Sequence, residues 1–186
     1  MAKVYIFFAD GFEEIEGLTV VDLLRRAEIE ITMVSITGNR NVLGAHRIAL
    51  IADALFEEMN YEDAAMLVLP GGMPGTNYLM QHEGLDVLLK ELHAKGKPIA
   101  AICAASSVLG MKGILNGKNA TCYPGFEEKL LGANVLKTSV VVDGNVITSR
   151  GMGTAIDFSL SIIHYLIGGN AASKIAEAIL YEKNFM

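Results

Sequence analysis

Short, uninterrupted apolar runs recur along the chain, and each ends at polar or glycine-rich residues. Four of them, KVYIFFA, IEITMVSI, AMLVL and KPIAAIC, occupy residues 3–9, 29–36, 65–69 and 97–103. Runs of this length between turn residues are typical of buried β-strands. Strands that are apolar on both faces are typical of a parallel sheet with helices covering both sides.

Segments with helical periodicity lie between and after these runs. In the first of them apolar residues recur every three or four positions, and Arg25 and Arg26 stand in the last turn, where cations favour the helix dipole. We predict helices over residues 14–27, 83–96, 104–115, 154–167 and 171–183.

The remaining segments are shorter. Residues 46–53 (HRIALIAD) indicate a further strand or a short hairpin, and Asp143-Gly144 marks a hairpin turn within residues 134–149. No internal repeat, low-complexity tract or linker interrupts the chain. Residues 1–186 therefore form one predicted domain, an α/β sandwich around a mostly parallel sheet.

Composition and charge narrow the class of protein. The chain is 52% hydrophobic, which allows a sizeable core, and its net charge of −6 disfavours nucleic acid as the main partner. The N-terminal apolar stretch is too short for a signal peptide, and no window reaches the roughly 18 apolar residues of a membrane span. We expect a cytoplasmic protein with no membrane partner.

Cysteine and histidine usage predicts neither disulfides nor metal. Cys103 and Cys122 are the two cysteines, and they form no C-x-x-C pair, so both are expected to be free thiols. The four histidines show no zinc-like spacing with them. We expect no metal and no organic cofactor.

Three loops follow predicted strands and should converge on one crevice. They are ADGFEEIE, LPGGMPGTN and ICAAS, at residues 9–16, 69–77 and 102–106. Ligands of open parallel sheets bind beyond the carboxyl ends of the strands. This edge is therefore the predicted functional site.

Cys103 lies between a strand and a helix in the third loop. Free backbone N–H groups and the helix dipole stabilise a thiolate at such a place, which favours a nucleophile. The alternative is a packed, inert cysteine, because free cysteines are among the most buried residues.

The second loop offers backbone donors. Gly71 and Gly72 allow the chain to approach closely, and their N–H groups with that of Ala104 could form an oxyanion hole. A plain strand-to-helix turn is the alternative use of this Gly-Gly pair.

Three glutamates follow the first strand. We expect Glu13 and Glu14 to be solvated charges at a helix start. Glu16 lies on a different face and could point toward Cys103, where desolvation and a nearby thiolate would raise its pKa. A protonated Glu16 would then be a candidate proton shuttle.

The chain resembles the ThiJ/PfpI superfamily over nearly its whole length, and within it the branch of the parkinsonism-associated deglycase (DJ-one) and its bacterial relatives. Five motifs carry the resemblance, in the order and spacing of the family. They are GFEEIE, VDLLRRA, VLPGGMPG, AAICAA and TSRGMGTAIDF. The resemblance implies a flavodoxin-like sandwich, a homodimer, a reactive Cys103 and a protonated Glu16. It places the oxyanion site at the N–H groups of Gly72 and Ala104. It also implies an arginine of the partner subunit near the pocket, for which Arg47 and Arg26 occupy the matching positions.

The chain departs from the family pattern at three positions. Tyr123 stands where some relatives have a histidine, and tyrosine is a poor base near neutrality because its pKa is about 10. Ala104 stands where the protease-like branch has a histidine, which disfavours a Cys-His peptidase. Met152 replaces a common proline. Cys122, beside Tyr123, either lines the pocket or is a small buried residue.

Two functions remain open from these residues. The first is a glyoxalase or deglycase type of enzyme, in which Cys103 attacks reactive 2-oxoaldehydes or their early adducts with amines and thiols. The second is a non-enzymatic redox sensor or redox-regulated chaperone of oxidative stress, since an exposed low-pKa thiol is readily oxidised.

Overall fold

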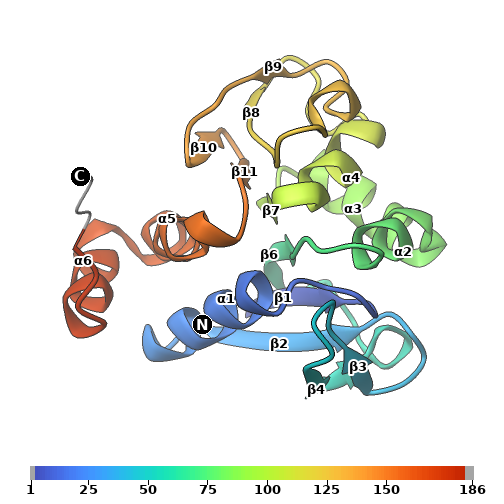
Figure 1. The fold of residues 1–186 in the computed structure, drawn as a ribbon, viewed down its shortest axis with the longest axis horizontal. Coiled ribbons are helices and arrows are strands. Elements are labelled where there is room, and N and C mark those ends of the chain that lie inside the picture. The colour runs from blue at the N-terminus through green and yellow to red at the C-terminus, as the bar shows by residue number, and fades with distance from the viewer. Residues whose placement is uncertain (1–2, 183–186) are drawn as a thin grey trace.

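The computed structural model describes residues 3–182, which form three layers around one seven-stranded sheet (Figure 1). The strand order is β10-β11-β7-β6-β1-β2-β5, and every neighbouring pair is parallel except β10 with β11. The strands of this sheet are β1 (Lys3–Phe8), β2 (Glu30–Ser35), β5 (Ala54–Leu55), β6 (Ala64–Leu69), β7 (Ile99–Ile102), β10 (Val140–Asp143) and β11 (Val146–Ser149). The predicted mostly parallel α/β sandwich is confirmed.

Helices cover both faces of the sheet. The long helices are α1 (Glu14–Arg26), α3 (Glu83–Ala94), α5 (Ala155–Ile167) and α6 (Gly169–Ala178), and the short ones are α2 (Gly75–Gln81) and α4 (Ser106–Met111). Helices α1 and α5 pack together on one face, and α3 and α4 lie on the other (Figure 1). Helix α6 packs against α5.

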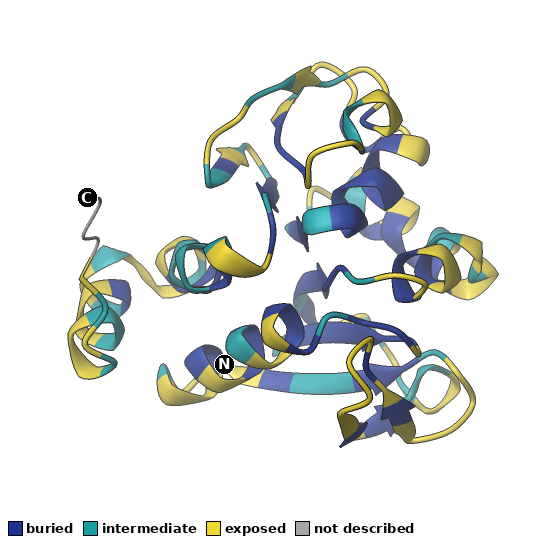
Figure 2. Cartoon of the chain, viewed as in Figure 1, coloured by how far each residue is buried: buried dark blue, intermediate teal, exposed yellow. Residues whose placement is uncertain are grey.

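Alternation along β1 divides the core in two. Val4, Ile6 and Phe8 belong to the cluster with α1 and α5, whereas Tyr5 and Phe7 belong to the cluster with α3 and α4. Successive side chains of a strand point to opposite faces, so a strand covered on both sides is apolar throughout. The dark central ribbons of Figure 2 show this burial.

A small hairpin lies outside the main sheet. Strands β3 (Asn41–Leu43) and β4 (Ala49–Ile51) pair antiparallel, which gives the hairpin form of the strand predicted around residues 46–53. The hairpin docks on the β1–α1 loop, because Gly11 N–H donates to Leu43 O and Ala45 N–H donates to Phe12 O. It therefore covers the start of α1.

The structure differs from the predicted elements in several places. Residues 75–81 form α2, although the whole stretch 69–77 was expected to be a loop. The helix predicted over residues 104–115 is a 3-10 turn, Cys103–Ala105, followed by α4. The last helix ends at Ala178, and Lys183, its predicted end, lies outside the described residues.

Several short elements complete the fold. Between β7 and β10, strands β8 (Asn119–Ala120) and β9 (Asn134–Val135) form a separate parallel pair, with the 3-10 turn η3 (Glu127–Lys129) between them. Two further 3-10 turns are η1 (Phe56–Glu58), after β5, and η4 (Met152–Thr154), after β11. Among the described residues, no helix is long and apolar enough to cross a membrane.

Candidate active site

Cys103 follows β7 directly and has a left-handed backbone with φ of 62°. A non-glycine residue rarely adopts this conformation, and such strained residues cluster at functional sites. The turn leads into α4, so the side chain is held at the sheet edge rather than within the sheet. Its partial exposure contrasts with the full burial of β7.

Glu16 lies on the first turn of α1 and is only 1% exposed. Its Oε2 accepts a 2.9 Å hydrogen bond from the N–H of Gly71, and its carboxyl group also hydrogen bonds to the Cys103 thiol. Burial raises the pKa of Glu16 to about 7, although these two hydrogen bonds oppose that rise. The carboxyl group is therefore able to hold a proton near neutral pH.

Cys103 and Glu16 lie so close together that a negative charge on one disfavours a negative charge on the other. Burial raises the pKa of the Cys103 thiol, and a negative charge on Glu16 raises it further. The N–H groups of Ala104 and Gly72 act in the opposite direction by donating toward the sulfur. Two adjacent negative charges are disfavoured in a buried site, so the pair retains one proton between its sulfur and its carboxyl group.

The two glycines after β6 have different functions. At Gly71 an added Cβ would lie 2.5 Å from Oε2 of Glu16 and 2.7 Å from Cβ of Cys103, so a side chain would push the pair apart. The N–H of Gly71 donates to Glu16, so this N–H is not part of the predicted oxyanion hole. Gly72 has φ of 94° and directs its N–H toward Cys103.

An open pocket of about 550 Å³ contains the predicted residues Cys103, Glu16, Gly72 and Tyr123. Residues that the sequence analysis did not select also line it: Glu13, His46, Pro124, Arg150, Gly151, Met152, Gly153 and Thr154. The motif TSRGMGT contains several of these, and it begins at the end of β11, the neighbour of β7 in the sheet. That adjacency was the signal that could have found them.

Tyr123 reaches the pocket through a backbone contact. Its N–H donates to the carbonyl oxygen of Cys103 at 3.3 Å, and its half-exposed side chain lies against Gly151. Cys122, the next residue inward, is 2% exposed and packs in the core with α4. This packing matches the second alternative for Cys122, a small buried residue, and burial raises its pKa to about 11.

The two arginines lie outside the pocket lining of their own chain. Arg26 ends α1 and forms an exposed ion pair with Asp22 at 2.7 Å. Arg47 is exposed in the hairpin turn, with φ of 65°. Their placement near the pocket of a partner subunit stays a prediction.

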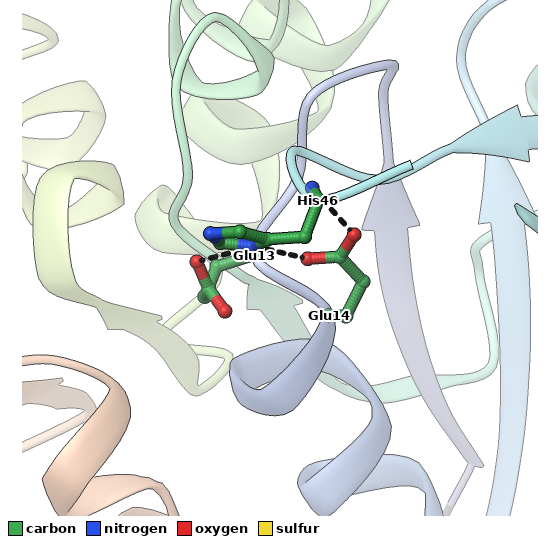
Figure 3. Close-up of side chains that lie close together, drawn as sticks. All are labelled: Glu13, Glu14 and His46. Atoms are coloured by element: carbon green, nitrogen blue, oxygen red, sulfur yellow. Dashed lines mark hydrogen bonds and ion pairs between the residues drawn. The ribbon is translucent and has the colours of Figure 1, made fainter. Parts of the chain in front are cut away.

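Glu14 is buried rather than solvated, which corrects the expectation for this residue. Its Oε1 accepts the N–H of His46 at 2.7 Å, and its Oε2 lies 2.9 Å from Nδ1 of the same histidine (Figure 3). Glu13 is also partly buried, with Oε2 3.6 Å from that nitrogen. The cause is the β3–β4 hairpin, which folds back over the start of α1.

Glu13, Glu14 and His46 have the side-chain types of a metal site, and their ligand atoms lie within 4.8 Å of one another. Glu14, however, already accepts hydrogen bonds from the backbone of His46 and Ile48 and from the imidazole. These contacts clamp the hairpin to the start of α1, which gives the cluster a structural role.

Comparison with known proteins gives a family match for most of the chain. Residues 2–165 match the DJ-1/PfpI family. The chain is 35% identical to protein dj-1beta of Drosophila melanogaster, over 96% of this chain and 97% of the relative. It is 33% identical to a deglycase of Pyrococcus abyssi, over 81% and 91%. It is 35% identical to protein DJ-1 homolog B of Arabidopsis thaliana, but spans less than half of that relative's length, 42%, and 98% of its own.

Solved structures have the same fold. The oxidized DJ-1 of Toxoplasma gondii superposes with a TM-score of 0.94 at 35% identity, covering 97% of this chain and 99% of the other. A mutant of a DJ-1 superfamily protein from Salmonella typhimurium gives the same TM-score at 32% identity, covering 98% and 100%.

Proposed function

Because this chain belongs to the DJ-1/PfpI family, we propose that it converts reactive 2-oxoaldehydes, or their early adducts with amines and thiols, into 2-hydroxy acids. The observation that carries the proposal is the hydrogen-bonded Cys103–Glu16 pair, which holds a nucleophile and a proton carrier in one pocket. The relative named as a deglycase supports the same class of substrate.

The first step is addition of the Cys103 thiolate to the aldehyde carbon. The carbonyl electrons move to the oxygen, which the N–H groups of Gly72 and Ala104 stabilise. That oxygen takes the proton of Glu16, and the product is a neutral hemithioacetal beside a Glu16 carboxylate. The strained turn at Cys103 keeps the sulfur aimed at the pocket.

The second stage moves hydrogen between two carbons. Glu16 removes the proton from the former aldehyde carbon, which leaves an enediolate, and returns it to the neighbouring carbon, while the hydroxyl proton of the hemithioacetal moves to the former ketone oxygen. The result is a thioester of the 2-hydroxy acid. Glu16 then takes a proton from water, whose oxygen attacks the thioester and expels the thiolate. Methylglyoxal plus water thus becomes lactate and a proton, with no net oxidation.

Redox sensing is the second candidate. Cys103 is partly exposed in the pocket, whereas Cys122 is buried, so an oxidant would meet one thiol selectively. Peroxide would oxidise Cys103 to a sulfenic acid with release of water, and a second peroxide to a sulfinic acid. One structural relative, the DJ-1 of Toxoplasma gondii, was solved in an oxidized form, and this supports the second candidate.

A homodimer is proposed as the working form. Exposed apolar side chains lie on α1 and on the β3–β4 hairpin that packs against it, and such a concentration marks interaction surfaces. They include Ile15, Leu18, Leu43, Ile48 and Ile51. Sedimentation of the purified chain tests the dimer.

Lactate formation from methylglyoxal without glutathione tests the enzyme, and absence of lactate from the reduced protein would shift the proposal to redox sensing.

A further inference from the structure

His46 joins the reactive pair in the pocket from a distant part of the chain. It lies in the β3–β4 turn, about 30 residues after α1 begins and far in sequence from Cys103. During the isomerisation, the two steps proposed for Glu16 move a proton at carbon. The same isomerisation requires a proton to reach the ketone oxygen and another to leave the hemithioacetal hydroxyl, and none of the roles assigned above supplies these two transfers.

The geometry of His46 is that of an oriented imidazole. Oε2 of the buried Glu14 lies 2.9 Å from its Nδ1, and Oε1 of Glu14 accepts the backbone N–H of the same residue at 2.7 Å. Glu14 therefore fixes the ring and the turn together, as Figure 3 shows. The absence of a side chain at Gly44 leaves the space that the Glu14 carboxyl group occupies.

This arrangement selects one nitrogen for chemistry. With Nδ1–H donated to Glu14, the ring's second nitrogen, Nε2, is left free of that carboxylate. Carboxylate partners orient a catalytic histidine in this way and stabilise its cation. The hydrogen bond to Glu14 and the charge of Glu13 also raise the pKa of His46.

We infer that His46 is the second proton carrier of the pocket, moving a proton between the two oxygens of the bound 2-oxoaldehyde while Glu16 moves one between its carbons. The inference rests on the proposed function. Nε2–H of the imidazolium protonates the ketone oxygen as Glu16 removes the carbon-bound proton. The neutral ring then takes the proton of the hemithioacetal hydroxyl as the thioester forms, which restores the imidazolium.

The proton count closes without another reagent. One hydrogen moves from carbon to carbon through Glu16, one moves from oxygen to oxygen through His46, and both residues end the isomerisation as they began it. Tyr123 is then not required as a base. The pathway therefore does not need the histidine that some relatives have in place of Tyr123, because His46 of the hairpin brings an imidazole into the pocket.

The test compares His46→Gln with His164→Gln, both assayed for lactate formation from methylglyoxal with the thiol verified as reduced. His164 lies on α5 outside this pocket, so it provides the same chemical change away from the site. General acid–base catalysis contributes about 10²- to 10⁴-fold, and we expect kcat of His46→Gln to fall by at least about tenfold. His164→Gln should retain wild-type turnover.

Two further readouts separate proton transfer from structure. Free imidazole should restore part of the turnover of His46→Ala, which loss of the Glu14 contact to the hairpin alone would not allow, because added imidazole replaces the proton carrier and not the clamp. Wild-type kcat should fall as pH rises and His46 and Glu16 lose their protons, and in His46→Gln only the dependence due to Glu16, whose pKa is about 7, should remain. The other titratable or charged groups at this face are Glu13, Glu14, Glu16, Cys103, Tyr123 and Arg150, all of which are unchanged in the variant.

The outcomes are distinct. Wild-type lactate formation with normal kcat in His46→Gln, or a rise in KM alone, would overturn the role of His46 and leave the proposed function standing. No lactate from the wild-type protein would overturn both. Loss in His46→Gln that free imidazole reverses in His46→Ala supports the inference.

Discussion

The backbone N–H of Gly71 donates a 2.9 Å hydrogen bond to Oε2 of Glu16. This contact joins the loop after β6 to the first turn of α1, and it fixes the carboxyl group beside Cys103. Because β1, β6 and β7 are neighbours in the sheet, their carboxyl-terminal loops meet at one edge. The reactive pair is therefore a product of sheet order.

Gly71→Ala should disrupt this contact. The new Cβ would lie 2.5 Å from Oε2 of Glu16 and 2.7 Å from Cβ of Cys103, so the loop must shift. Overpacking of this kind costs about 1–3 kcal/mol, and we expect a loss of that size in the free energy of unfolding, measured with denaturant. Gly153→Ala is the matched control for stability, because its Cβ would meet no atom within 4 Å. Equal stability of the two variants would contradict the close packing at Gly71.

Glu14→Gln should destabilise the protein in a pH-dependent way. Burial raises the pKa of Glu14, but hydrogen bonds from His46 and Ile48 outweigh it and lower the pKa below 4.5. That contribution is present above pH 4.5 and is lost as pH falls through the folded pKa. His46 has a pKa raised above 6.5, so its contribution is full below pH 6.5 and is lost as pH rises through the folded pKa.

Both contributions coincide between pH 4.5 and 6.5. The drop in melting temperature on Glu14→Gln should be largest in that window and smaller on either side. Asp22→Asn removes an exposed pair with Arg26 on the same helix and should change stability little at any pH. A Glu14→Gln effect that is the same at pH 5.5 and pH 9 would contradict the ion pair with His46.

Oxidation should distinguish the two cysteines. Cys103 is partly exposed in the pocket, whereas Cys122 is 2% exposed. Because access to the oxidant differs, mild peroxide should modify Cys103 first, as read by mass spectrometry of the intact protein and its peptides. The Cys122→Ser variant should keep the oxidation rate of Cys103. Equal modification of both thiols would count against a selective sensor.

Local patterns predicted most of the fold. The apolar runs that became β1, β2, β6 and β7 are strands buried on both faces, which makes them recognisable from composition alone. Residues 75–81 were missed because Gly75 and the preceding Pro74 read as loop residues, although proline is tolerated next to a helix start. Tertiary contacts there outweighed local propensity.

The site was predictable only where sequence and sheet order coincide. Cys103, Glu16 and Gly72 each follow a strand, so the sequence alone predicts that they converge at one edge of the sheet. His46 could not, because the docking of the hairpin on the β1–α1 loop depends on backbone hydrogen bonds that leave no sequence pattern. The burial of Glu14 follows from the same docking.

Lactate production from methylglyoxal without glutathione, by the wild-type protein and by Cys103→Ser and Glu16→Gln, tests the central claim most directly. We predict turnover in the wild type, none in Cys103→Ser, and a loss of about 10²- to 10⁴-fold in Glu16→Gln, because an amide cannot carry the carbon-bound proton. Melting curves of the three proteins control for folding. Undiminished turnover in Cys103→Ser would contradict the account.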